Sequence, residues 1–264
     1  NKKINVAITG YYKNQFINNF IFNNNNDNNT NQLAFKKYQE LKKNAHKHNI
    51  LINTLDLFNK NKPDCVIIVE YPGYKKIKNL LKLQVPLILL IEECEVVNNL
   101  NINSINLDYF HKIFTFDDDL ISKSDKFLKF NTYSFIENYK VSRNFENKKL
   151  LSLIASNKKS THLNELYSER LKIIEWYEKN NSKNFDLFGQ SWDKFVFPLN
   201  NNSLRYLNSK KFLLIQKFFA KKRNSWKGII KNKNLILSKY KFNIAFENSK
   251  NIKGYICEKI FDSF

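Results

Sequence analysis

Three glutamates within four positions form an acidic turn that could remove a proton from a hydroxyl group. Glu92, Glu93 and Glu95 directly follow the apolar run at 85–91. Repulsion between neighbouring carboxylates raises the pKa of one of them, which suits a general base. An acidic surface turn without a catalytic role is the alternative interpretation.

A glutamate–lysine pair near the end of the chain, Glu258 and Lys259, is a candidate anion-binding site. A polar loop containing Gly254 precedes it, and a helix is expected from Ile256 onward. A lysine in the first turn of a helix opposes the helix dipole, so an adjacent anion such as a diphosphate would explain its position. A solvent-facing lysine is the alternative.

Arg170 is a further candidate ligand for an anion. A helix is expected over 161–179, and at 3.6 residues per turn Arg170 falls near the middle of its apolar face. A charge there needs a partner, and an arginine can hold a diphosphate through two parallel hydrogen bonds. Pairing with a neighbouring glutamate, or extension to the surface, is the alternative.

Apolar runs alternating with helical stretches predict the elements that must position these residues. Strands that are apolar on both faces indicate parallel sheets covered by helices, which place their chemistry at the carboxyl ends of the strands. We expect an α/β protein with two Rossmann-like domains, 1–145 and 146–264, joined by a polar linker over 139–149. The expected strands are 4–8, 64–69, 85–91, 112–116, 150–155, 185–188 and 241–246.

The chain is strongly basic, with 44 Lys and Arg against 24 Asp and Glu and a net charge of +20. Such a charge attracts phosphates, nucleic acid or an anionic membrane surface. A coding preference for lysine and asparagine would explain part of it. The longest apolar run, 85–91, is far below the roughly 20 residues of a membrane helix. Three separated cysteines indicate reduced thiols, without a disulfide framework or zinc site.

The segment 240–264 reads YKFNIAFENSKNIKGYICEKIFDSF. It resembles the signature of family 10 glycosyltransferases, the α1,3/α1,4-fucosyltransferases, in their bacterial form. The resemblance rests on YKF-x-x-x-FEN-S followed by GY-x-x-EK-I. It implies a GT-B-like architecture, with two domains facing each other across a cleft and the second incomplete at its C-terminal end. It also implies inverting transfer of fucose from GDP-fucose to a glycan acceptor, such as a surface polysaccharide or lipopolysaccharide.

The resemblance implies a role for each matching residue. Glu93 aligns with the general base, while Arg170 would replace a diphosphate-binding arginine that aligns with Leu163. Cys257 departs from the threonine or serine that is commoner in the family. The implied donor contacts are Asn248 with the phosphate region, Tyr255 with the guanine, Glu258 with the ribose hydroxyls and Lys259 with the diphosphate.

The resemblance implies no cofactor and no required metal. Asp117, Asp118 and Asp119 suggest a metal site, but an acidic helix N-terminus explains them equally well. We expect a cytoplasmic location, or a peripheral one on the inner face of an anionic membrane, and no nucleic-acid partner. Three alternatives stay open: a transferase for another nucleotide sugar, a non-enzymatic basic nucleic-acid-binding protein, and an inactive fragment.

Overall fold

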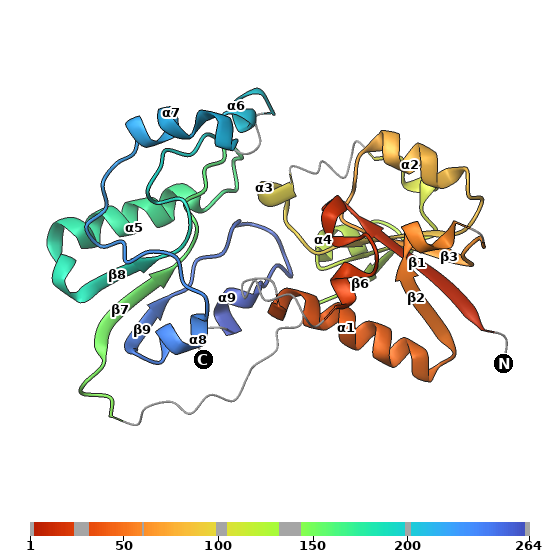
Figure 1. Ribbon diagram of the computed structural model, residues 1–264, viewed down its shortest axis with the longest axis horizontal. Helices are drawn as coiled ribbons and strands as arrows, with labels where there is room; N and C mark the ends of the chain where they lie inside the picture. The colour runs from red at the N-terminus through yellow and green to blue at the C-terminus, as the bar shows by residue number, and fades with distance from the viewer. Residues whose placement is uncertain are drawn as a thin grey trace. The chain divides into compact units, whose positions relative to one another are not determined.

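The chain forms two compact units in the computed structural model, which describes residues 3–23, 32–59, 61–98, 105–131, 144–198 and 202–261 (Figure 1). Unit 1 contains Asn1–Phe135 and Ile252–Tyr255, and unit 2 contains Ile136–Asn251 and Ile256–Phe264. The expected boundary after residue 145 lies ten residues beyond the one between the units, and the short segment Ile252–Tyr255, expected in the second domain, belongs to unit 1. Of the expected linker, 139–143 lies outside the described residues and Lys149 begins a strand.

Unit 1 is built on a parallel sheet of six strands in the order β2-β1-β3-β4-β5-β6. The central strands are almost wholly apolar, as in CVIIV of β3 and LILLI of β4, because both faces of a parallel sheet are buried. The strands are β1 (Ile4–Gly10), β2 (Ile50–Thr54), β3 (Cys65–Val69), β4 (Leu87–Ile91), β5 (Lys112–Thr115) and β6 (Phe127–Lys129).

Helices α1 (Gln32–Lys47) and α2 (Tyr74–Leu81) lie on opposite faces of this sheet (Figure 1). The β1–β2 and β3–β4 connections step in opposite directions across the sheet, so right-handed crossovers place their helices on opposite faces. The direction changes between β1 and β3, and open α/β sheets bind ligands at such switch points. The shorter helices are α3 (Glu95–Asn98), α4 (Asp118–Ile121) and the 3₁₀ turns Lys13–Gln15, Phe20–Phe22, Leu55–Phe58 and Leu107–Tyr109.

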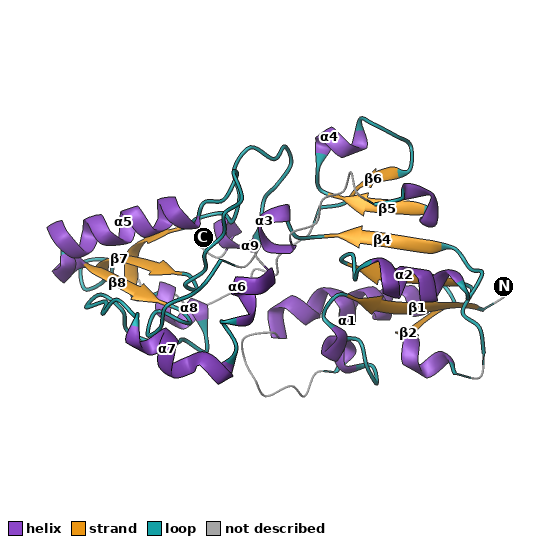
Figure 2. Cartoon of the chain, turned by 90° about the horizontal axis from the view of Figure 1, so that it is seen from above, coloured by secondary structure: helices purple, strands orange, loops and turns teal. Residues whose placement is uncertain are grey.

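Unit 2 is built on a parallel sheet of three described strands in the order β8-β7-β9. The strands are β7 (Lys149–Ile154), β8 (Phe185–Phe188) and β9 (Tyr240–Ile244). Helix α5 (Tyr167–Asn180) packs on them through Ile174, which joins Leu153 and Leu187 in the core of the unit. In the view of Figure 2, β7 and β8 lie between α5 and α7 (Leu213–Phe218). The remaining elements are α6 (Asn202–Tyr206), α8 (Lys233–Leu237), α9 (Glu258–Phe261) and the 3₁₀ turns Ser182–Asn184 and Lys210–Phe212.

The helix expected from about residue 161 begins only at Tyr167. Backbone hydrogen bonds to the 248–250 segment hold the preceding residues as a loop: Leu166 N–H donates to the Asn248 carbonyl and Lys250 N–H to the Asn164 carbonyl. Leu163, which the expected helix would have included, therefore lies outside α5 and is 89% exposed.

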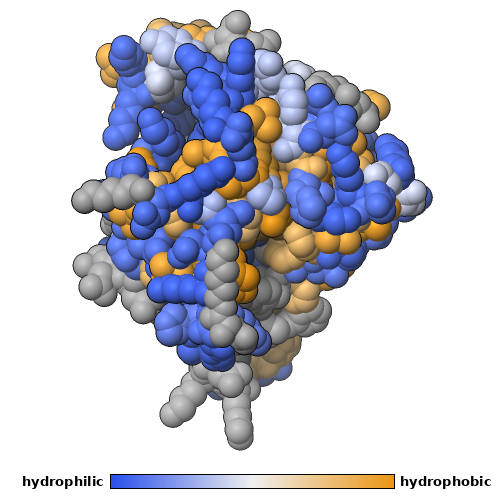
Figure 3. Space-filling view, turned by 90° about the vertical axis from the view of Figure 1, so that its right-hand side faces the viewer, coloured by the Kyte–Doolittle hydropathy of each residue, from blue (hydrophilic) through white to orange (hydrophobic). Residues whose placement is uncertain are grey.

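Hydrophilic side chains cover most of the described surface in the view of Figure 3, with hydrophobic ones visible between them. Some exposed hydrophobic residues are usual on folded proteins, because polar side chains cannot cover the whole surface. None of the helices formed by the described residues is long and apolar enough to cross a bilayer.

Candidate functional site

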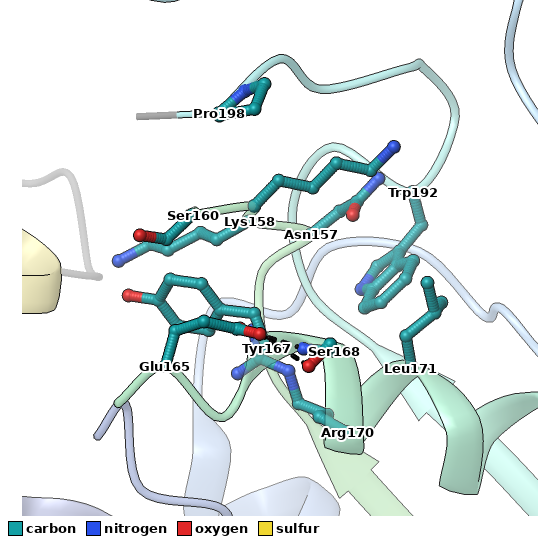
Figure 4. Close-up of a pocket in the computed structure, with 11 residues that line it drawn as sticks. Asn157, Lys158, Ser160, Glu165, Tyr167, Ser168, Arg170, Leu171, Trp192 and Pro198 are labelled. Carbon is teal, nitrogen blue, oxygen red and sulfur yellow. Dashed lines mark hydrogen bonds between the residues drawn. The ribbon is translucent and has the colours of Figure 1, made fainter. Parts of the chain in front are cut away.

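A cavity of about 210 Å³ lies at the N-terminal end of α5, within unit 2. Loop residues Asn157, Lys158 and Ser160 line it across from Tyr167 and Arg170 (Figure 4). The volume is below the roughly 300–1,000 Å³ of a complete small-molecule site, so the cavity suits one part of a ligand.

Arg170 is the buried cation of this cavity. Its residue surface is only 3% exposed, and one described hydrogen bond holds the guanidinium, from Nη2 to the Ser156 carbonyl at 3.1 Å. Its buried Nε has no hydrogen-bond partner among the described residues. Burial lowers the pKa of Arg170 to about 10, which still leaves it protonated at neutral pH. A buried cation with donor capacity to spare can bind an anion.

The other charged groups of the cavity make its lining positive. Lys158 and Lys159 line it together with Arg170, against one carboxylate, Glu165. Glu165 accepts hydrogen bonds from both the backbone N–H and the hydroxyl of Ser168, so its charge is directed at the first turn of α5. The balance of charge therefore favours an anionic ligand.

The loop formed by Phe246, Glu247, Asn248 and Ser249, hereafter the FENS loop, is fixed against the loop that precedes α5. Besides the bond from Leu166 N–H to the Asn248 carbonyl, the Ser249 hydroxyl donates to the Asn164 carbonyl at 3.0 Å. Asn248 and Ser249 are both buried. Since Arg170 N–H in turn donates to the Leu166 carbonyl, the structure brings Asn248 and Arg170 to the same end of α5.

Lys259 lies in a small polar cluster with Cys257 and Glu258, which a hydrogen bond connects to the FENS loop. Its Nζ donates to Cys257 Sγ at 3.0 Å and pairs with Glu258 at 3.3 Å. Burial by itself lowers the pKa of Lys259, but the adjacent Glu258 and Cys257 raise it above its usual value. A protonated lysine with these partners can still attract an anion, although Glu258 already offsets part of its charge.

Glu247 connects this cluster to the FENS loop, and sequence reasoning did not single it out. Its Oε1 accepts a hydrogen bond from Cys257 N–H at 3.0 Å, while its buried Oε2 has no partner among the described residues. The only sequence signal was its position inside the FENS motif. Its carboxylate contributes to the field that keeps Lys259 charged.

Glu93 lies in unit 1, in the turn between β4 and α3, and is half-buried. The adjacent Glu92 accepts a hydrogen bond from the Tyr38 hydroxyl at 2.6 Å and pairs with Lys37 at 2.8 Å. These partners make Glu92 a structural anchor for the turn. The role of Glu93 in proton transfer stays a prediction.

Glu70 fixes the backbone of the acidic turn through hydrogen bonds, and sequence reasoning missed this residue. It directly follows β3 and is 2% exposed. Its Oε1 accepts hydrogen bonds from the backbone N–H groups of Glu92 and Glu93 at 2.6 and 2.9 Å, and its Oε2 accepts one from Asn98 Nδ2 at 2.6 Å. Burial raises the pKa of Glu70 to about 7. Its position at the carboxyl end of a buried strand was the signal that could have revealed it.

Tyr255 lies in unit 1, near the acidic turn. Its ring packs at 5.1 Å from that of Phe116, and its side chain hydrogen-bonds Cys94, the residue after Glu93. The structure thus places Tyr255 in a different unit from Asn248 and Lys259. Its proposed contact with the guanine stays a prediction.

The three aspartates at 117–119 make hydrogen bonds and ion pairs within unit 1. Asp117 caps α4 by accepting hydrogen bonds from Asp119 N–H and Leu120 N–H. The other two carboxylates pair with Lys129 and Lys253. These contacts are those of an acidic helix N-terminus. No group of three or more His, Cys, Asp or Glu side chains that could hold a metal ion occurs within the described ranges.

Comparison with known proteins supports the architecture. The chain is similar to a solved structure described as an α1,3-fucosyltransferase, with a TM-score of 0.52 and 16% sequence identity. The match covers 98% of this chain and 65% of the other. The sequence matches no protein-family model and no curated protein. The fold is therefore α/β and GT-B-like, with Rossmann-like units built on parallel sheets, as the sequence predicts.

Proposed function

We propose that this chain is an inverting glycosyltransferase that binds GDP-fucose and transfers fucose to a hydroxyl of a glycan, such as a surface polysaccharide or lipopolysaccharide. The observation that carries the proposal is Arg170, a buried cation in a positively lined cavity, fixed beside the FENS loop. The likeness in fold and the motifs of segment 240–264 support the same assignment.

The donor phosphates are assigned to unit 2. Arg170 has a free Nε–H among the described residues and can donate to a phosphate oxygen in the cavity. Lys259 would add positive charge, and Asn248 would donate from the FENS loop. Because the leaving diphosphate gains negative charge in the transition state, preorganised donors of this kind stabilise that state more than the ground state. The proposed reaction requires no metal or other cofactor.

The acceptor step is assigned to Glu93. Its carboxylate would take the proton of the acceptor hydroxyl while the oxygen attacks the anomeric carbon of fucose and the bond to the diphosphate breaks. Inversion follows because attack and departure occur on opposite faces of that carbon. Glu70 would hold the Glu93 backbone in place through the hydrogen bond at 2.9 Å.

Competition between nucleotides tests the donor assignment. We expect GDP and GDP-fucose to raise the melting temperature of the protein, and UDP-sugars to leave it unchanged. Equal stabilisation by GDP and UDP would favour a transferase for another nucleotide sugar.

Arg170→Ala should weaken GDP binding by about 1.5–3 kcal/mol, the usual value of a hydrogen bond to a charged group. Lys172→Ala is the matched control, because Lys172 is exposed on the same helix and pairs with Glu169 at 2.8 Å. Isothermal titration calorimetry measures both affinities, and equal losses would contradict the role of Arg170.

A further inference from the structure

A long part of unit 2 carries basic residues without a single acidic one. No Asp or Glu occurs between Asp193 and Glu247. This stretch accounts for 13 positive charges in a chain whose net charge is +20. The proposed transfer reaction uses none of them. They are Lys194, Arg205, Lys210, Lys211, Lys217, Lys221, Lys222, Arg223, Lys227, Lys231, Lys233, Lys239 and Lys241.

Helix α7, inside this stretch, buries a polar residue and exposes apolar ones. Gln216 is 1% exposed, and its Nε2 donates to the carbonyls of Leu207 and Ser209 at 2.6 and 3.0 Å. Leu214 and Phe218, four residues apart on one face of the helix, are 83% and 84% exposed. This is the reverse of the usual arrangement in a helix that packs on a protein core.

Four exposed lysines lie within α7 or within four residues of its ends in the sequence: Lys210, Lys211, Lys217 and Lys222. None of them has an ion-pair partner among the described residues. Nearby Lys221 and Arg223 differ, because both are paired with Glu175 on α5 at 2.8 and 3.0 Å. These ion pairs attach the stretch to α5 of unit 2. The four lysines can therefore interact with an external anionic partner. We call Leu214, Phe218 and these four lysines the α7 surface.

We propose that the α7 surface docks unit 2 onto an anionic lipid surface. Exposed leucine and phenylalanine insert at the boundary between headgroups and acyl chains, and flanking lysines interact with acidic headgroups. Charge complementarity alone would also fit nucleic acid. Leu214 favours lipid, because an exposed aliphatic side chain gains by entering the acyl region and has no ring on which a base could stack.

Cosedimentation with vesicles tests the proposal without any measurement of transfer activity. Wild-type protein should bind phosphatidylcholine vesicles containing 30% phosphatidylglycerol and should not bind pure phosphatidylcholine vesicles. We expect Leu214→Ser with Phe218→Ser to weaken binding about tenfold or more. Replacing the four lysines of the α7 surface by glutamine should weaken it by about 50-fold or more. GDP-dependent thermal stabilisation should stay unchanged in both variants, showing that they fold.

Four exposed lysines of unit 1 provide the matched control. Glutamine at Lys47, Lys75, Lys78 and Lys82 removes the same net charge and should leave vesicle binding within about threefold of wild type. Equal losses in the two quadruple variants would overturn the proposal in favour of a diffuse charge effect. Tighter binding to a single-stranded oligonucleotide, insensitive to the Leu214 and Phe218 changes, would overturn it in favour of nucleic acid.

Discussion

Glu70 adopts a left-handed backbone conformation, with φ of 60°, at the point where β3 ends. A residue other than glycine pays for this geometry with strain of order 1–3 kcal/mol. The conformation coincides with the three hydrogen bonds that its carboxylate accepts from the acidic turn and Asn98. We interpret Glu70 as a positioning residue for Glu93.

The pKa of Glu70 makes stability depend on pH in a defined direction. Its folded-state pKa of about 7 lies above its ordinary value, so between about pH 4.5 and 7 the folded state retains a proton that the unfolded state has released. Stability contributed by this group is therefore present at low pH and decreases as pH rises through that window. We expect the free energy of unfolding to decrease by roughly 3 kcal/mol across this window, and Glu70→Gln should abolish the decrease. Urea unfolding at pH 5, 6, 7 and 8 measures it.

Glu40→Gln is the control for this measurement. It removes the same charge from a half-exposed position on α1 and should leave the pH dependence as in wild type. A Glu70→Gln variant with the same pH dependence as wild type would show that Glu70 does not titrate in this range.

If Glu93 is the general base, Glu93→Gln retains the shape of the side chain but cannot accept a proton. Turnover of fucose transfer should then fall by about 10²- to 10⁴-fold. The affinity for GDP should change little, because no donor contact is assigned to Glu93. Glu95→Gln, two residues away, should cost far less. A larger loss at Glu95 would move the role of base to that residue.

At the scale of elements, the end of β8 depends on a glycine. Gly189 has φ of 130°, and a Cβ atom there would lie 2.0 Å from the Ala155 carbonyl oxygen. The glycine also accepts a hydrogen bond from Trp226 Nε1 at 2.9 Å. The strand can therefore end beside the β7 backbone only without a side chain at this position.

Gly189→Ala should destabilise unit 2 by about 2–4 kcal/mol, because backbone strain and the clash with Ala155 add to each other. Gly228→Ala is the matched control. Gly228 has φ of 101°, but a Cβ atom there meets nothing within 4 Å, so only the strain of about 1–2 kcal/mol remains. Chemical denaturation measures both changes, and an equal loss in the two variants would contradict the steric argument.

At the scale of the whole molecule, each unit has its own apolar core and parallel sheet. We therefore expect two calorimetric unfolding transitions. The transition that shifts in the Glu70→Gln variant belongs to unit 1, and the transition that shifts in the Gly189→Ala variant belongs to unit 2.

Saturating GDP should raise the transition of unit 2 more than that of unit 1, since Arg170, Asn248 and Lys259 all belong to unit 2. The stabilisation should be about 2.7 kcal/mol at a GDP concentration of 100 Kd. A larger shift in unit 1 would instead indicate that Tyr255 and its neighbours make the main nucleotide contacts.

The sequence by itself determined seven of the nine described strands and the burial of Arg170, whereas β2 and β6 were not among the expected strands. Continuous apolar runs, such as 65–69 and 87–91, are buried most readily as strands of a parallel sheet, and helical periodicity is sufficient to place Arg170 on an apolar face. The FENS and EK segments likewise stand out as local motifs. Patterns of this kind depend on residues that are close together in the chain.

Only the tertiary structure decided the features that depend on distant residues. Helix α5 begins at Tyr167 because the 248–250 segment takes up the backbone groups of the preceding loop. Glu70 reaches the acidic turn because β3 and β4 are neighbours in the sheet. The segment with Tyr255 joins unit 1, and α7 turns Gln216 inward and Phe218 outward. Each outcome depends on hydrogen bonds and packing between segments far apart in sequence, which local periodicity does not encode.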